Sequence, residues 1–300
     1  MCYILKLADG GSWRITAFPE AQAWLEKFAA ITAIRQFPGE NIPRIIVIRG
    51  PRSADVMELL CATHADGEVF RTLPDDGWIK GSFRYSTYVL HPKTHDIIYN
   101  IITGTDETAE FAAMRDLLKI LYYQVQQHGG IPFHAALIEH SGRGIILCAR
   151  GSTGKSTCCR RVPQPWRALC DDETLVVRTA PQQYAAHPFP TWSEYMNGNT
   201  EAVRDVKQSV PLAAVVFLEQ AGKDELLPFR KAQAVVLMNQ FAYLSNLLLV
   251  RQLGRNDRLA FASLIFDNVA NLARYVPAYI LKVSLTGRFW EELEKIEAFA

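Results

Sequence analysis

The sequence predicts an α/β protein in which a P-loop domain follows a smaller, strand-rich α+β domain. The apolar run 144–148 leads into a glycine-containing loop and then into a short helical segment, which is the context that a P-loop requires. Beyond residue 105, apolar strand-like runs alternate with segments of helical period. Before it, short β-branched and aromatic runs are separated by glycine and proline turns. We therefore expect one domain over 1–105 and a second over 106–300.

The first domain is expected to consist mainly of short strands. One helix is predicted over 19–28, because Pro19 suits the first turn of a helix. The domain contains no catalytic constellation, and a role in binding a protein or peptide through a sheet edge rests on its position alone. Its predicted strands are 3–7, 12–17, 44–49, 83–90 and 97–102.

The second domain is expected to begin with a helix over 106–128, where apolar residues recur at intervals of three and four before Gly129-Gly130. The apolar runs 132–138 and 144–148 predict a hairpin, with Gly142 in its turn. The remaining predicted elements are strands at 175–177, 184–186, 210–220 and 278–285, and helices at 231–249, 257–273 and from Gly287 onward.

Residues 149–157, Ala-Arg-Gly-Ser-Thr-Gly-Lys-Ser-Thr, match the P-loop pattern except that alanine replaces the first glycine. Glycines at 151 and 154 permit a tight loop whose backbone N–H groups point at a phosphate. Lys155 would lie along the β- and γ-phosphates of ATP, and the Ser156 hydroxyl would join the Mg²⁺ shell. The predicted nucleotide-binding residues are Gly151, Ser152, Thr153, Gly154, Lys155, Ser156 and Thr157.

Two aspartates follow the P-loop closely. Asp171 and Asp172 end a short predicted strand, 166–170, and Asp171 comes sixteen residues after Lys155. Carboxylates that face a P-loop suit metal binding or base catalysis. Successive side chains on a strand face opposite sides, but both aspartates can serve one site if the strand ends there. By spacing alone, His134 on the predicted strand 132–138 would be a core residue.

The order of His134, P-loop, short helix, short strand and paired aspartates resembles the C-terminal catalytic domain of HPr kinase/phosphatase, with its HPr-kinase or phosphoenolpyruvate-carboxykinase-like P-loop fold. The resemblance is strong over residues 134–173 and weaker over the rest of the C-terminal half. Within that family the chain is most similar to HPr-kinase-related proteins found beside genes for ribosomally made peptides, including the SynChlorMet cassette and lasso-peptide kinases. The tail 283–294 also resembles theirs.

The resemblance implies roles for four residues. Asp171 would be the base that accepts a proton from an attacking serine hydroxyl, and His134 would interact with this catalytic carboxylate. Asp172 would support metal or geometry, and Glu194 would help to hold Mg²⁺. The glycine-rich segment that follows the glutamate in the family is not reproduced cleanly here.

The function expected from the motif and the resemblance is an ATP- and Mg²⁺-dependent serine kinase. Its acceptor would be a small protein or a ribosomally made precursor peptide. A small-molecule kinase remains an alternative, as does a nucleotide-sensing regulatory or scaffold protein that binds ATP without transfer. HPr kinases form hexamers, so the resemblance also implies self-association.

Composition excludes some partners. A net charge of +1 gives no global field that would attract nucleic acid or an anionic membrane. No targeting signal and no uninterrupted apolar run of about eighteen residues is found, so we expect a cytoplasmic protein. The cysteines lack CxxC spacing and are expected to be core residues in a reducing cytosol; they are Cys2, Cys61, Cys148, Cys158, Cys159 and Cys170.

Overall fold

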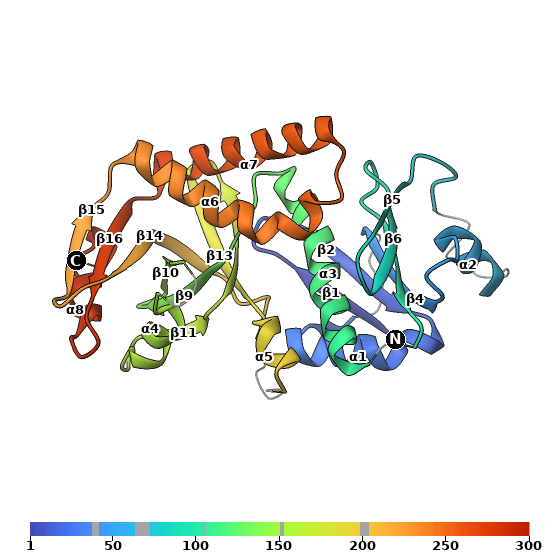
Figure 1. Cartoon of the computed structure of the whole chain (residues 1–300), viewed down its shortest axis with the longest axis horizontal. Helices are drawn as coiled ribbons and strands as arrows, with labels where there is room; N and C mark the ends of the chain where they lie inside the picture. Colours follow the sequence, from blue (N-terminus) through green and yellow to red (C-terminus); the bar gives the residue numbers. More distant parts are fainter. Residues whose placement is uncertain (38–41, 64–72, 105, 151–152, 199–203, 300) are drawn as a thin grey trace. The chain divides into compact units, whose positions relative to one another are not determined.

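The computed structural model is a mixed α/β protein with two multi-stranded sheets and several helices (Figure 1). It describes residues 1–37, 42–63, 73–104, 106–150, 153–198 and 204–299. The chain forms two compact units. The first contains Met1–Lys6, Gly10–Gln124 and Trp192–Val203, and the second contains Leu7–Asp9, Val125–Thr191 and Arg204–Ala300.

The first unit is built around a seven-stranded sheet of order β3-β1-β2-β4-β7-β6-β5. The pairs β2/β4 and β4/β7 are parallel, and the other neighbours are antiparallel. The strands are β1 (Cys2–Lys6), β2 (Ser12–Ala17), β3 (Arg35–Gln36), β4 (Arg44–Gly50), β5 (Ile79–Ser82), β6 (Ser86–Leu90) and β7 (Ile97–Ile102). The helices are α1 (Gln22–Thr32), α2 (Val56–Thr63), α3 (Glu107–Gln126, in this unit as far as Gln124) and α5 (Trp192–Met196).

Helix α3 is held to the first unit by specific contacts. The Tyr99 hydroxyl on β7 donates a hydrogen bond to the carbonyl of Ala113 at 2.6 Å. Glu110 accepts a hydrogen bond from the Trp24 indole at its carbonyl, 3.2 Å, and from Arg49 at its carboxylate, 2.8 Å. The predicted boundary after residue 105 would have placed this helix in the second domain, whereas these contacts place it with the first sheet.

The second unit is built around a nine-stranded sheet in which β10 and β14 are central. The strand order is β11-β9-β10-β14-β13-β12-β8. In addition, β16 pairs in parallel with β14, and β15 pairs antiparallel with β16. The strands are β8 (Ile131–Phe133), β9 (Ala135–His140), β10 (Arg143–Cys148), β11 (Arg167–Cys170), β12 (Glu173–Ala180), β13 (Gln183–Phe189), β14 (Val210–Gln220), β15 (Glu225–Pro228) and β16 (Ala278–Val283). The helices are α4 (Lys155–Arg161), α6 (Lys231–Val250), α7 (Arg255–Tyr275) and α8 (Phe289–Leu293).

Both faces of this sheet are covered, which explains why β10 and β14 are apolar along most of their length. Successive residues of β14 point to opposite faces. Val216 therefore packs in the core cluster that includes Phe289 of α8. Phe217 instead faces α6, where its ring centroid lies 6.0 Å from that of Phe241.

Helix α6 is the one helix in the described part of the chain that is long and apolar enough to cross a membrane by length and composition. It packs against α7 and β8 in the second unit, as core helices of folded proteins do, and Figure 1 shows α6 and α7 side by side. Polar residues on α6 also have partners there. The Asn246 amide exchanges two hydrogen bonds of 3.0 Å with the Gln126 amide.

One predicted strand is divided in the structure. The apolar run 132–138 forms β8, which pairs with β12, and β9, which pairs with β10 and β11. His134 lies at the break between the two strands and not within a strand. The chain thus changes partners at His134, and this break frees the histidine side chain from the alternating pattern of the core.

Candidate functional site

Three chain segments meet at one edge of the second sheet because of the directions of their strands. Strand β9 is antiparallel to both β10 and β11, so β10 and β11 run the same way. The start of β9 therefore lies at the same edge as the ends of β10 and β11, and Ala135 pairs directly with Cys148. Consequently His134, the loop after Cys148 and the residues after Cys170 gather at this edge.

The described part of the P-loop enters α4 at Gly154, which caps the helix with a φ of 114°. This left-handed conformation favours glycine, and an added Cβ would meet no neighbouring atom, so backbone strain alone would oppose a substitution. Thr153 precedes the cap, and Ser156 and Thr157 lie half-buried in the first turn of α4. Two predicted phosphate-binding residues, Gly151 and Ser152, lie outside the described residues.

Lys155 begins α4 and has a buried side chain that is 8% exposed. Its ammonium donates a hydrogen bond to the Ala149 carbonyl at 3.3 Å and lies 3.1 Å from His134 Nε2. It also lies 3.8 Å from Asp172 Oδ1. The same Asp172 oxygen is 3.3 Å from His134 Nδ1. Lys155, His134 and Asp172 thus form one connected cluster, which we call the carboxyl-end cluster.

The contacts of His134 define how its ring takes part in the cluster. An ammonium group has hydrogen-bond donors and no acceptor, so Lys155 donates to Nε2 of a neutral ring. The ring proton of that tautomer is on Nδ1, where it can be donated to Asp172 Oδ1. His134 therefore connects the ammonium and the carboxylate and orients both. The Asp172 side chain remains 34% exposed, so it is open to a ligand or substrate.

Asp171 has a different environment from Asp172. Its Oδ1 accepts a hydrogen bond from the Thr191 hydroxyl, at the end of the loop that follows β13. The resemblance implied that His134 would contact Asp171 as the catalytic carboxylate, whereas the structure pairs His134 with Asp172. The reason is local, because β11 ends at Cys170 and the two aspartates occupy a bend in which their side chains diverge.

Glu194 lies on α5, in the first unit, and its predicted role as a metal ligand remains a prediction. Within the described ranges, no group of three or more His, Cys, Asp or Glu side chains is arranged to hold a metal ion. A Mg²⁺ ion bound largely through nucleotide phosphates needs only one or two protein ligands. Ser156 and Asp172 can supply these, since one follows Lys155 directly and the other contacts it.

The cysteines near this edge are packing residues. Burial raises the pKa of the Cys158 and Cys170 thiols to about 11 in each case, and burial also raises the pKa of Cys148 and Cys159. These thiols are therefore neutral near pH 7 and are poor nucleophiles and metal ligands. None of the six cysteines, all of which lie in the described ranges, forms a disulfide.

Two further residues support the site, and no sequence motif indicated them. Thr191 lies twenty positions from the aspartate whose oxygen it binds. Arg161, at the end of α4, donates hydrogen bonds to the carbonyls of Ser284, at 2.7 Å, and Gly287. Both hydrogen bonds connect α4 to the C-terminal segment 283–294, so this segment helps to fix the position of α4.

Comparison with known proteins assigns the chain to a family. No curated protein matches it. The family model for SynChlorMet cassette protein ScmC matches residues 97–298, which is well over half of the chain and includes the whole carboxyl-end cluster. The chain therefore belongs to the family of the SynChlorMet cassette protein ScmC.

Proposed function

We propose that the protein is an ATP- and Mg²⁺-dependent serine kinase whose second unit is a P-loop domain related to HPr kinase. The observation that carries the proposal is the carboxyl-end cluster. A buried lysine of P-loop sequence, a histidine and a carboxylate are in contact at the edge where a central strand ends. In α/β sheets this edge is where ligands commonly bind.

Lys155 would bind the phosphates of the nucleotide. Its ammonium now contacts the Ala149 carbonyl, His134 and Asp172. Phosphate oxygens of ATP would replace the weakest of these contacts, the 3.8 Å approach to Asp172. A bound Mg²⁺ would neutralise charge on the phosphates, and the Ser156 hydroxyl is the residue placed to hold it when Asp172 acts as the base.

Asp172 and His134 would activate the acceptor hydroxyl. The serine oxygen attacks the γ-phosphorus, the bond between that phosphorus and the β,γ-bridging oxygen breaks, and ADP leaves. The hydroxyl proton passes to the Asp172 carboxylate, which His134 holds in place from its Nδ1 side. His134 is a positioning residue here, since it acts through Asp172. This assignment gives Asp172 the role of base that the resemblance gave to Asp171.

Two observations support a peptide or small protein as the acceptor. The chain belongs to the family of a cassette protein, and it resembles kinases found beside genes for ribosomally made peptides. We therefore propose a precursor peptide or small protein with an acceptor serine as the substrate, and a cytoplasmic location where ATP is available.

The test is phosphoryl transfer from γ-labelled ATP with the full-length protein. The acceptors are a precursor peptide encoded beside the gene, the same peptide with its serines replaced by alanine, and a panel of small hydroxyl compounds. We expect label on the serine peptide alone. Label on a small compound would make the protein a small-molecule kinase. Binding of ATP without labelling any acceptor would favour a nucleotide sensor and contradict the proposal.

A further inference from the structure

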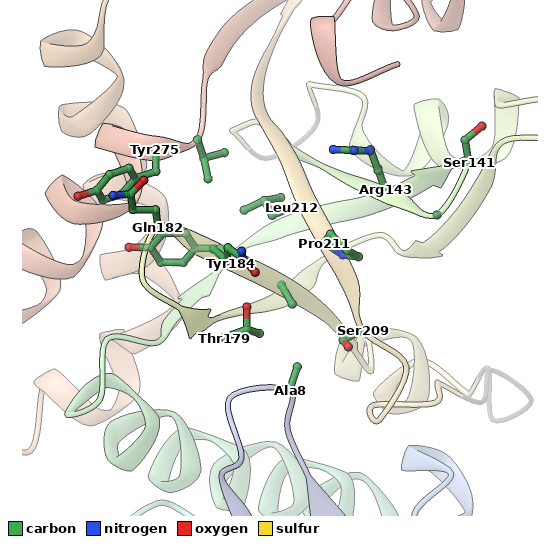
Figure 2. Close-up of a pocket in the computed structure, with 14 residues that line it drawn as sticks. Ala8, Ser141, Arg143, Thr179, Gln182, Tyr184, Ser209, Pro211, Leu212 and Tyr275 are labelled. Atoms are coloured by element: carbon green, nitrogen blue, oxygen red, sulfur yellow. The ribbon is translucent and has the colours of Figure 1, made fainter. Parts of the chain in front are cut away.

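A second candidate site lies at the opposite end of β10 from the carboxyl-end cluster. It is a cavity of about 680 Å³ in the second unit (Figure 2). The β9–β10 turn, the β12–β13 turn, the start of β14 and the end of α7 line it. Its volume falls within the range of about 300–1,000 Å³ that is typical of sites for small molecules.

Among the described residues, the lining contains one charged side chain and no carboxylate. The charge belongs to Arg143, and Figure 2 shows this side chain on one side of the cavity and the rings of Tyr184 and Tyr275 on the other. Pro211 and Leu212 of β14 add apolar surface between them. The site therefore offers a cation at one end and aromatic rings at the other.

The polar side chains around the cavity are accessible to a ligand from solvent. Arg143, Gln182 and Gln183 are exposed, Ser209 is half-buried and Tyr275 is 47% exposed. Tyr184 is 6% exposed, so its ring forms part of the wall of the cavity. A ligand would therefore replace water around these side chains and would not have to break contacts within the protein.

The unpaired strand edges near the cavity are short. The β13–β14 pairing covers Ala185 and Ala186, so Gln183 and Tyr184 have no partner on β14. The β8–β12 pairing ends at Val176, four residues before β12 ends at Ala180. A peptide that adds to a sheet needs a free edge, and unpaired stretches of two and four residues favour a small molecule over an extended peptide.

The single guanidinium also favours one kind of anion. Its planar fork matches a carboxylate with two parallel hydrogen bonds. A multiply charged phosphate would call for further cations or a metal, and Arg143 is the one charged residue in the described lining. The tyrosine rings suit a flat apolar or aromatic body.

We propose that this cavity binds a small organic carboxylate with an aromatic or apolar body, its carboxylate paired with Arg143 and its body packed against Tyr184 and Tyr275. The site is separate from the proposed kinase site, because Arg143 begins β10 and the P-loop follows the other end of the same strand. Binding at this cavity therefore does not depend on the proposed kinase activity.

The experiment is a titration of the full-length protein, followed by calorimetry or ligand-observed NMR. The probes are N-acetyltyrosine and indole-3-acetate, their neutral amides, and inorganic phosphate. We expect the acids to bind at least about tenfold more tightly than their amides, the difference expected for a charge-assisted hydrogen bond. R143Q should remove this preference, and R255Q, which changes another exposed arginine of the second unit, should keep it.

Every outcome of this titration bears on the proposal. Equal affinity for acid and amide, or a preference that survives in R143Q, would overturn it. So would failure of both acids to bind at millimolar concentration, or binding of phosphate or of the precursor peptide alone. Repeating the titration with K155A separates the two sites, because we expect unchanged binding of the acids in a variant that has lost ATP binding.

Discussion

The two ends of β10 differ in how far their polar groups are already engaged. At the carboxyl end, Lys155, His134 and Asp172 contact one another within 3.1–3.8 Å. At the other end, Arg143 and Tyr275 beside the cavity are exposed. The same strand therefore carries a preassembled cluster at one end and a set of side chains open to solvent at the other.

This difference separates two kinds of site. A cluster whose members orient one another is suited to chemistry, because catalytic groups must be held close to their working geometry before the substrate arrives. A cavity whose polar side chains are open to solvent is suited to binding, because a ligand can replace the water around them. The predictions below separate the two ends by changing one end at a time, or the strand between them.

The largest effect on ATP binding is expected for Lys155→Ala. It removes the only cation of the carboxyl-end cluster, and we expect ATP binding to weaken by at least about 100-fold, the loss of a charge-assisted contact in a buried site. ATP titration of the full-length protein measures this. Arg160→Ala, at an exposed position of the same helix, is the control. Normal ATP affinity in Lys155→Ala would contradict the proposal that Lys155 binds ATP.

Leu147→Ala, in the strand between the two ends, should lower the stability of the whole second unit. Leu147 is fully buried in the core cluster beneath α4, and removing its side chain leaves a cavity. We expect a loss of about 2–5 kcal/mol in unfolding free energy, measured by urea denaturation. Leu285→Ala, at a residue that is 86% exposed, should leave the midpoint unchanged. A loss below the measurement error would show that the core beneath α4 is not tightly packed.

His134→Gln should disturb the carboxyl end alone. The amide cannot reproduce both ring contacts, so Asp172 is less well oriented and transfer should slow by up to about 100-fold, with ATP affinity changed less. Single-turnover transfer and ATP titration separate the two quantities. His140→Gln, at the opposite end of β9, should transfer at the normal rate. A slowed His140 variant would point to a general effect on β9.

Acid should weaken the cavity end first. Burial lowers the pKa of His187 from its ordinary 6.5, although hydrogen bonding to Val206 and the charge of Asp9 oppose the shift. The neutral ring accepts a hydrogen bond from the amide of Ala8, a cavity residue, at 3.0 Å. A lowered folded pKa means that stability is full above pH 6.5 and falls as the pH drops below it.

The expected loss at acid pH is about 1 kcal/mol, the net contribution of a typical hydrogen bond, because the protonated ring can no longer accept from the Ala8 amide. Thermal unfolding between pH 5 and 7.5 measures it. In His187→Gln this pH dependence should be reduced. An unchanged profile in that variant would assign the acid sensitivity to other groups.

The smallest effect is expected for Lys282→Gln. Its ammonium pairs with Glu225 at 2.8 Å, but both side chains are more than one third exposed. Exposed pairs are screened by solvent and contribute little. The unfolding midpoint should therefore remain that of the wild type, and a clear decrease would indicate that the β15–β16 edge contributes more than its exposure suggests.

Much of the fold could be predicted from the sequence, because most elements have a clear period. The strand 210–220 has the predicted bounds, and α3 differs from its prediction by only one or two residues at either end. The short elements α2 and β15 were not predicted. The break at His134 could not be predicted either, because the apolar run 132–138 continues through it and nothing in the pattern signals a change of strand partner.

The residues of the carboxyl-end cluster could be predicted from the sequence, but the contacts between them could not. The sequence indicated Lys155, His134 and the two aspartates, since motif and strand ends identify them. Which aspartate meets His134 depends on the bend after Cys170, a matter of a few backbone angles that composition does not determine. The cavity could not be predicted at all, because its lining comes from separate turns and strand ends brought together by the fold.

Single-turnover transfer from γ-labelled ATP, measured for Asp172→Asn and for Asp171→Asn, tests whether Asp172 is the base. We expect Asp172→Asn to bind ATP and to slow transfer by about 10²–10⁴-fold. We expect Asp171→Asn to slow it much less, because the Asp171 carboxylate is bound to Thr191. The reverse order, or an Asp172→Asn variant that transfers at the wild-type rate, would contradict the assignment of Asp172 as the base.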